Sequence, residues 1–206
     1  MALKYKHSPI KWRAVFAESA FIGASILLAF ALQDWDEAKD IEERTLIALC
    51  NVKSELAFNR VLLKSDYVPR QQGMLRLSYA AVSQLQAQPD ANLEEAHFEK
   101  MLLRESLRYS AWTLAGESGY LVYANFQLAT EIGALLDYQE DRYQVMVDRI
   151  NSAIMELKLS TVESPLDYYL SLSTTIEEWI AQTQYLEGKY DALFEREDFI
   201  NLACED

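Results

Sequence analysis

The first long apolar segment of the chain runs from Ala14 to Leu32 and carries a single charge, at Glu18. As a helix of 19 residues it would be about 28 Å long at ~1.5 Å per residue, close to the ~30 Å hydrocarbon thickness of a bilayer. Trp12 and Trp35 stand on either side, and aromatic rings of this kind settle at headgroup depth. The pattern predicts a transmembrane helix over residues 14–33, preceded by a basic segment over residues 1–13.

Two other interpretations of this apolar segment stay open. A secretory signal peptide also places basic residues before an apolar stretch, but this stretch is long for one, and residues 31–35 form a poor cleavage site. A buried core helix is the second alternative, although 19 nearly continuous apolar positions leave it no polar face.

Basic residues on the two sides of the segment predict its orientation. Four precede it and two follow within a short distance: Lys4, Lys6, Lys11 and Arg13, then Lys39 and Arg44. Cytoplasmic flanks of membrane helices carry the excess of Lys and Arg. We therefore expect a single-pass protein of the bacterial inner membrane, with a cytoplasmic N-terminus and a periplasmic C-terminal domain.

Five residues in and just after this segment are candidate contacts with the membrane or with a partner: Glu18, Gly23, Asp34, Trp35 and Asp36. Glu18 either reaches the headgroups or pairs with Arg13 or Lys11, or else it contacts another membrane subunit or lines a polar pore. Gly23, with neighbouring alanines, permits close approach of a second helix. Asp34 and Asp36 indicate a solvated face, or, in an oligomer, an acidic ring that concentrates cations.

Helical periodicity continues beyond the segment, and it predicts a stalk helix over residues 34–68 that ends before Pro69. Leu49, Leu56 and Leu63 repeat every seven residues, with Asn59 as a polar position on the same stripe. Two interpretations fit this short repeat: a helix that packs on its own domain, or a parallel coiled coil.

Residues 70–206 carry the pattern of an antiparallel helical bundle. Helices are expected over residues 70–88, 92–109 and 125–159, the last with Asn125 as N-cap, and a final helix begins at Ser164-Pro165. Apolar and aromatic residues recur at three- and four-residue steps in this final helix: Tyr169, Leu172, Ile176, Trp179, Thr183, Leu186, Tyr190 and Leu193. Trp179 should therefore be buried, facing the helix that contains Ile150 and Ile154. The expected fold class is all-α.

The stretch from Ser110 to Gly119 predicts a short helix and a sharp turn. Ser110 is a suitable N-cap, Trp112 is a large packing residue, and Gly116 and Gly119 can end the helix in the left-handed conformation. The sequence Gly-Glu-Ser-Gly-Tyr around Ser118 lacks the spacing of a nucleophile elbow, and no strand precedes it. We therefore do not expect a hydrolase.

Composition supports the helical prediction and disfavours several classes of function. The 206 residues include only 6 Gly and 4 Pro, and the formal charge of −13 disfavours binding to nucleic acid. His7 and His97 stand far apart, so no metal site, cofactor site or catalytic cluster can be assembled. Cys50 and Cys204 are also distant in sequence, which favours unlinked thiols over a disulfide.

Two segments resemble a bacterial family of uncharacterised, single-pass, membrane-anchored helical proteins. The first is AESAFIGASILLAFALQDWDEAKDIEERTLIALCNVKSELAFN, with its Ala-Leu-Gln-x-Trp exit, and the second is SAWTLAGESGYLVYANFQLATEIGALLDYQE. The resemblance implies an N-terminal span followed by a helical domain, and it implies no activity. Family members tend to be basic just after the span, where this chain is acidic.

We expect a non-enzymatic interaction or sensory subunit, tethered to the lipid bilayer by its N-terminal helix and presenting a helical bundle to a protein partner or to another copy. The alternative is an oligomeric membrane effector whose spans form or gate a leak when the helical domain is triggered. An enzyme is not expected, because no nucleophile, base pair or metal cluster has a usable spacing.

Overall fold

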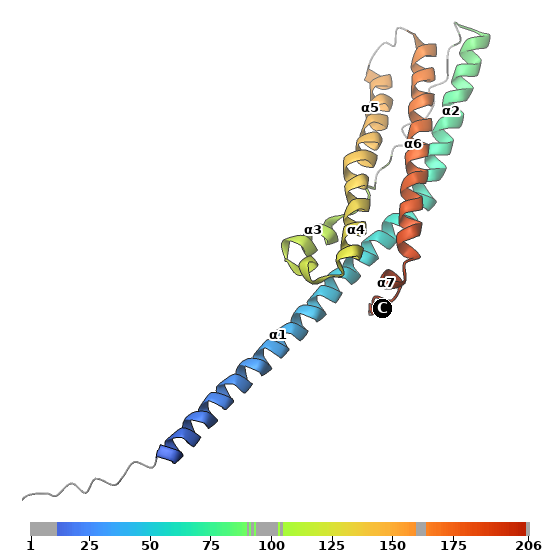
Figure 1. The fold of residues 1–206 in the computed structure, drawn as a ribbon. Coiled ribbons are helices and arrows are strands. Elements are labelled where there is room, and N and C mark those ends of the chain that lie inside the picture. Colours follow the sequence, from blue (N-terminus) through green and yellow to red (C-terminus); the bar gives the residue numbers. More distant parts are fainter. Residues whose placement is uncertain are drawn as a thin grey trace, which may run out of the picture. The chain divides into compact units, whose positions relative to one another are not determined.

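The computed structural model describes residues 12–89, 91, 93, 103, 105–159 and 164–204, and within its helices the side chains of residues 13–15, 17 and 155–159 are not described. Every regular element in this part of the chain is a helix (Figure 1), which confirms the all-α prediction. The chain divides into two compact units, Met1–Arg44 and Thr45–Asp206.

Unit 1 (Met1–Arg44) holds the first part of α1 (Trp12–Leu62), and α1 continues into unit 2 (Thr45–Asp206) without a break. A helix is expected here, because neither Pro nor a Gly pair interrupts the segment. Within the part of the chain whose side chains are described, no helix is long and apolar enough to cross a membrane. The side chains of residues 14, 15 and 17, which belong to the expected span, are not described.

In unit 2 the chain stays helical through the point where a break was expected. A π-helical turn, η1 (Leu63–Tyr67), joins α1 to α2 (Val68–Ala87), and Tyr67 keeps helical angles of φ −65° and ψ −53°. The expected end before Pro69 is therefore wrong. Pro69 lies in the first turn of α2, where its missing N–H removes no necessary hydrogen bond, and the wider π turn carries the chain into this position.

The expected helix over residues 125–159 forms as three successive pieces. Asn125 caps α4 (Phe126–Tyr138) by accepting hydrogen bonds from the N–H groups of Gln127 (3.0 Å) and Leu128 (3.1 Å). A second π turn, η4 (Gln139–Gln144), then leads into α5 (Val145–Leu159). The N-cap prediction is confirmed, whereas the π turn has no signal in the apolar periodicity, which continues through it.

Helices α5 and α6 (Pro165–Phe194) form the expected antiparallel hairpin, and α2 lies along α6 (Figure 1). Ser164 caps α6, with Pro165 in its first turn. All eight residues of the predicted stripe on α6 are buried, and Trp179 is completely buried. The core of unit 2 also takes in Leu49, Val52, Leu56 and Leu63, so the heptad stripe packs on its own domain.

The expected helix over residues 92–109 lies mainly outside the described residues, but its last part is not helical. Residues 105–109 form an irregular segment before α3 (Ser110–Glu117). The backbone N–H and C=O of Arg108 are both hydrogen-bonded to the Asn59 side chain. These bonds replace the helical ones, and therefore the prediction of helix there is wrong.

A disulfide joins Cys50 of α1 to Cys204, with the two Cα atoms 5.4 Å apart. The expectation of unlinked thiols is wrong, because a separation of 154 residues in sequence says nothing about distance in the fold. The C-terminal segment reaches α1 through α7 (Glu197–Ile200), whose Phe199 is completely buried. Lys53 Nζ donates to the carbonyl oxygens of Phe199 (2.8 Å) and Ile200 (3.1 Å).

Candidate functional site

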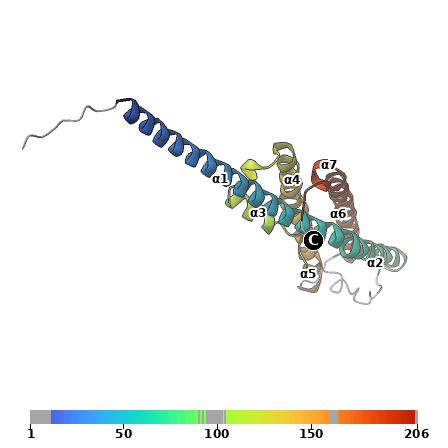
Figure 2. The same cartoon turned by 90° about the horizontal axis from the view of Figure 1, so that it is seen from below.

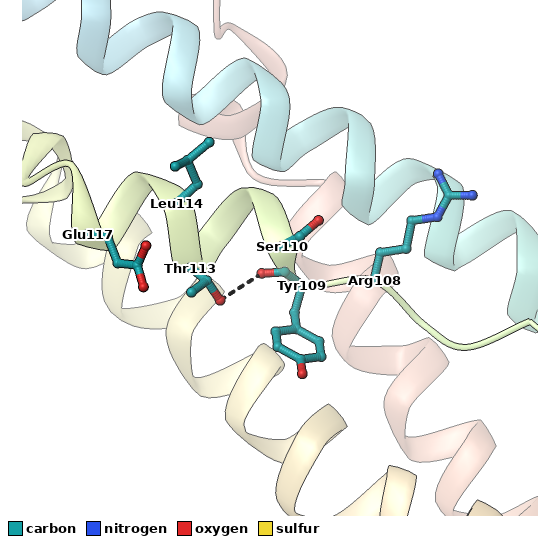
Figure 3. A pocket seen from close by; sticks show the side chains of 6 residues that line it. All are labelled: Arg108, Tyr109, Ser110, Thr113, Leu114 and Glu117. Carbon is teal, nitrogen blue, oxygen red and sulfur yellow. Dashed lines mark hydrogen bonds between the residues drawn. The ribbon is translucent and has the colours of Figure 1, made fainter.

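A groove of about 400 Å³ lies along α3 and is the candidate binding site of unit 2 (Figure 3). Six residues line it: Arg108, Tyr109, Ser110, Thr113, Leu114 and Glu117. Arg108 and Glu117 stand toward opposite ends of the labelled set, so a cation and a carboxylate bracket an apolar and hydroxyl-bearing middle. The groove is formed by local sequence, since all six residues come from one ten-residue stretch.

Glu55 of α1 fixes the beginning of α3. Its carboxylate accepts hydrogen bonds from the Ser110 hydroxyl (2.8 Å) and from the backbone N–H of Ala111 (3.2 and 3.1 Å). Ser110 was expected to be the N-cap, but the first residue outside α3 is Tyr109, which makes no side-chain cap bond. The cap is therefore supplied by Glu55, which precedes Ser110 by 55 residues, and a negative charge is favourable at this helix end.

Asn59 holds the segment just before α3, one turn after Glu55 along α1. Its Oδ1 accepts from the Arg108 backbone N–H (2.8 Å), and its Nδ2 donates to the Arg108 carbonyl (2.7 Å). The side-chain amide thus pairs with the backbone much as a neighbouring strand would. The polar position on the heptad stripe is explained by this contact, because an apolar residue there would leave two backbone groups without these partners.

The amide of Asn59 belongs to a buried cluster of polar side chains that come from three helices. Asn59 Nδ2 also donates to the Tyr190 hydroxyl of α6 (3.1 Å), and Gln139 Nε2 of η4 donates to the Arg108 carbonyl (3.2 Å). Burial raises the pKa of Tyr190, so this side chain remains a neutral phenol. A network of this kind fixes the register of helices that apolar contacts alone would leave free to slide.

A second buried cluster of polar side chains lies where the π turns η1 and η4 contact each other. Tyr67 of η1 stacks on Tyr143 of η4 with ring centroids 6.2 Å apart, and Gln71 Nε2 donates to Thr183 Oγ1 (2.5 Å). Thr183 Oγ1 is also 2.9 Å from the Tyr143 hydroxyl. The ring of Trp179 lies 6.5 Å from that of Tyr67. These contacts are enclosed, so they organise the core and present nothing to a ligand.

The sequence-predicted contact residues Glu18, Gly23, Asp34, Trp35 and Asp36 all lie on α1 within unit 1. All five are exposed, and a side chain added at Gly23 would meet no atom within 4 Å. Asp36 lines a shallow acidic hollow on the same helix.

Two polar side chains of the groove are already engaged by neighbouring residues. The Ser110 hydroxyl is engaged with Glu55, and Arg108 pairs with Glu105 (3.0 Å) while its guanidinium stacks on Phe58 at 3.5 Å from the ring centre. Among the described residues, no group of three His, Cys, Asp or Glu side chains could hold a metal ion. His7 and His97 lie outside the described residues.

The sequence predicted α3 but did not predict the two residues of α1 that hydrogen-bond to its start and to the segment before it. Glu55 and Asn59 are polar residues four apart on a helix, a pattern shared with any solvated helix face, so only their distant partners distinguish them. Comparison with known proteins adds no further guide: no family model, no curated protein and no solved structure matches the chain.

Proposed function

We propose that this chain is a non-enzymatic, single-pass membrane protein, whose N-terminal helix lies in the bilayer and whose helical unit 2 binds a protein partner outside the cytoplasm. The proposal rests first on the exposed apolar surface of α1 in unit 1. Large apolar side chains are exposed along it: Phe16, Phe21, Ile22, Ile26, Leu27, Leu28, Phe30 and Leu32, with Phe21 75% exposed. Water-exposed apolar surface of this extent requires a covering.

The distribution of these side chains favours lipid as the covering. At 3.6 residues per turn, the eight positions fall on all sides of the helix, so no polar face remains. A helix that packs on protein keeps a polar side for solvent, whereas a helix in hydrocarbon does not need one. Trp12 and Trp35, which are 65% and 66% exposed, stand at the two ends of the apolar part.

The disulfide supports an extracytoplasmic position for unit 2. Structural disulfides persist in oxidising compartments and are rare in the reducing cytoplasm. The bond between Cys50 and Cys204 agrees with the excess of basic residues before the span, which independently favours a cytoplasmic N-terminus. For a bacterium, this corresponds to a bundle in the periplasm.

The α3 groove supports partner binding by unit 2. It is open to solvent, contains both charge signs, and is held in a fixed conformation by Glu55 and Asn59. A preorganised surface loses little conformational entropy when a partner binds.

Membrane insertion and orientation can be tested together in the full chain. We expect the protein to stay in the membrane fraction after alkaline extraction, and a phosphatase fused after Asp206 to be active while a fluorescent protein fused there stays dark. Ile22→Lys combined with Ile26→Lys should release the protein, because two charges near the centre of a span are costly.

The matched control is Val145→Lys combined with Ile200→Lys, which places the same charges on exposed apolar positions of unit 2 (both 54% exposed). These substitutions should leave the protein in the membrane fraction. Release of the unaltered chain by alkali would refute the span, and an active fluorescent fusion would refute the orientation.

A further inference from the structure

An uncharged, exposed apolar segment of unit 2 stands out on an otherwise highly charged chain. Residues 118–130 contain no Asp, Glu, Lys, Arg or His, although a quarter of the whole chain is charged. Within this segment Val122, Tyr123 and Phe126 are 83%, 62% and 86% exposed, and the nearby Leu114 of α3 is 67% exposed. These four side chains are called the apolar tip below.

The apolar tip is built by a left-handed turn. Gly119, with φ of 79°, ends α3 and reverses the chain into the 3₁₀ turn η3 (Tyr120–Tyr123), after which Asn125 starts α4. The backbone groups at the bend are satisfied locally, since Gly119 N–H bonds to Gly116 O (3.0 Å) and Ala124 N–H to Leu121 O (3.2 Å). The side chains of Val122 and Phe126 are therefore presented by an ordered turn, and their exposure is not a consequence of a frayed chain end.

The segment that carries the apolar tip contacts the first residue of unit 2. Thr45 is the first residue of unit 2, and its hydroxyl donates to the carbonyl oxygen of Tyr120 in η3 (3.5 Å). Ten residues separate Trp35 from Thr45 in the sequence, so this part of unit 2 is tethered at most about 36 Å of extended chain from the expected end of the span. Figures 1 and 2 both show α3 and the start of α4 beside the part of α1 that enters unit 2.

We propose that the apolar tip formed by Leu114, Val122, Tyr123 and Phe126 inserts into the headgroup region of the same bilayer, so that unit 2 supplies the chain's second membrane contact. This inference rests on the proposed membrane function of α1. Aromatic and aliphatic side chains without charge are the ones that settle at the bilayer interface. The strongly acidic chain would otherwise be repelled by anionic lipid, so an uncharged segment is the part that can approach the surface.

The test is hydroxyl-radical labelling of the unaltered full chain, prepared with one copy in each lipid nanodisc, followed by mass spectrometry of individual residues. We expect Tyr123 and Phe126 to be oxidised several-fold more slowly than Tyr79 and Tyr185. These two reference residues are 47% and 51% exposed in unit 2, less than either residue of the tip. If lipid covers the tip, the order of the oxidation rates is therefore the reverse of the order expected from the exposed fractions alone.

Two variants distinguish lipid cover from other causes of protection. Val122→Asp combined with Phe126→Asp should raise oxidation of Tyr123 to the level of Tyr79, because two carboxylates leave the headgroup region. Val145→Asp, at an exposed apolar position on α5, should leave Tyr123 protected. Protection of Tyr123 that appears only with two copies in a disc would show contact with a second copy and would overturn the proposal.

Failure of this inference can be separated from failure of the proposed function. Slow oxidation of Phe21 and Phe30 in α1, together with Tyr123 and Phe126 oxidised as fast as Tyr79, would overturn the second contact and leave the span in place. Fast oxidation of Phe21 and Phe30 would overturn both.

Discussion

Trp179 is the largest of the completely buried side chains, and its burial was expected from its place in the α6 stripe. The sequence pattern also predicts that it faces Ile150 and Ile154, and in the fold its ring lies 6.5 Å from that of Tyr67 in η1. Periodicity along one helix decides which side of that helix is buried. It does not decide which helix covers that side, because the covering helix is set by the tertiary arrangement.

Replacing Trp179 with Ala should destabilise unit 2 by roughly 3–5 kcal/mol, because a large buried aromatic side chain is removed and a cavity remains. This is a large share of the stability of a typical domain. Glu178→Ala, at the adjacent exposed position, should change the melting temperature little. Thermal melts of the two variants provide the measurement, and equal small shifts would contradict the burial of Trp179.

Three buried tyrosines should make the fold sensitive to alkali. Burial raises the pKa of Tyr67, Tyr143 and Tyr190 above the ordinary value of 10. The neutral phenols are therefore favoured in the folded chain, and their contribution to stability is complete below pH 10 and is lost as the pH rises through the folded-state pKa values.

We expect the melting temperature to fall above pH 10, and part of the tyrosinate absorbance to appear only as the protein unfolds. Spectrophotometric titration beside circular dichroism would check this. A single titration of all the tyrosines near pH 10, with the fold intact, would contradict it.

At the scale of elements, α3 shows how a helix with a weak local start is completed by another helix. Glu55→Ala should remove the acceptor for Ser110 and Ala111 and cost on the order of 1–2 kcal/mol. Amide hydrogen exchange should accelerate over residues 110–117 more than elsewhere. Glu117→Ala, at the exposed C-terminal end of α3, is the matched control and should leave exchange there nearly unchanged.

The predicted elements were accurate where the signals are local. Asn125 and Ser164-Pro165 mark helix starts through bonds to residues two or three positions away, and both starts are confirmed. The sequence predicts a helix over residues 105–109, yet the Arg108 backbone bonds to the Asn59 side chain and the segment is not helical. Pro69 was expected to end a helix, yet a π turn accommodates it. Both errors come from partners or geometry that apolar periodicity does not encode.

At the scale of the whole molecule, the disulfide closes a loop over most of unit 2. Replacing Cys50 and Cys204 together with Ser should destabilise unit 2 by about 2–5 kcal/mol, since a long loop is released in the unfolded chain. Lys53 and Phe199 would still hold the C-terminal segment, so the folded structure should survive. Denaturant unfolding of the double variant, compared with the reduced and oxidised parent, gives the measurement. Identical midpoints for the oxidised parent and the variant would show that the bond does not form.

Sequence by itself determined the helical class, the buried stripe of α6, the helix caps and the apolar character of the first half of α1. These features depend on spacing and chemistry within a few residues, and neighbouring positions on a helix carry that information. Only the tertiary structure decided that Glu55 caps α3, that Asn59 binds the Arg108 backbone and that Cys50 meets Cys204. Each of these contacts joins residues that are distant in sequence, and their pairing follows from the way whole helices pack, to which no local pattern gives access.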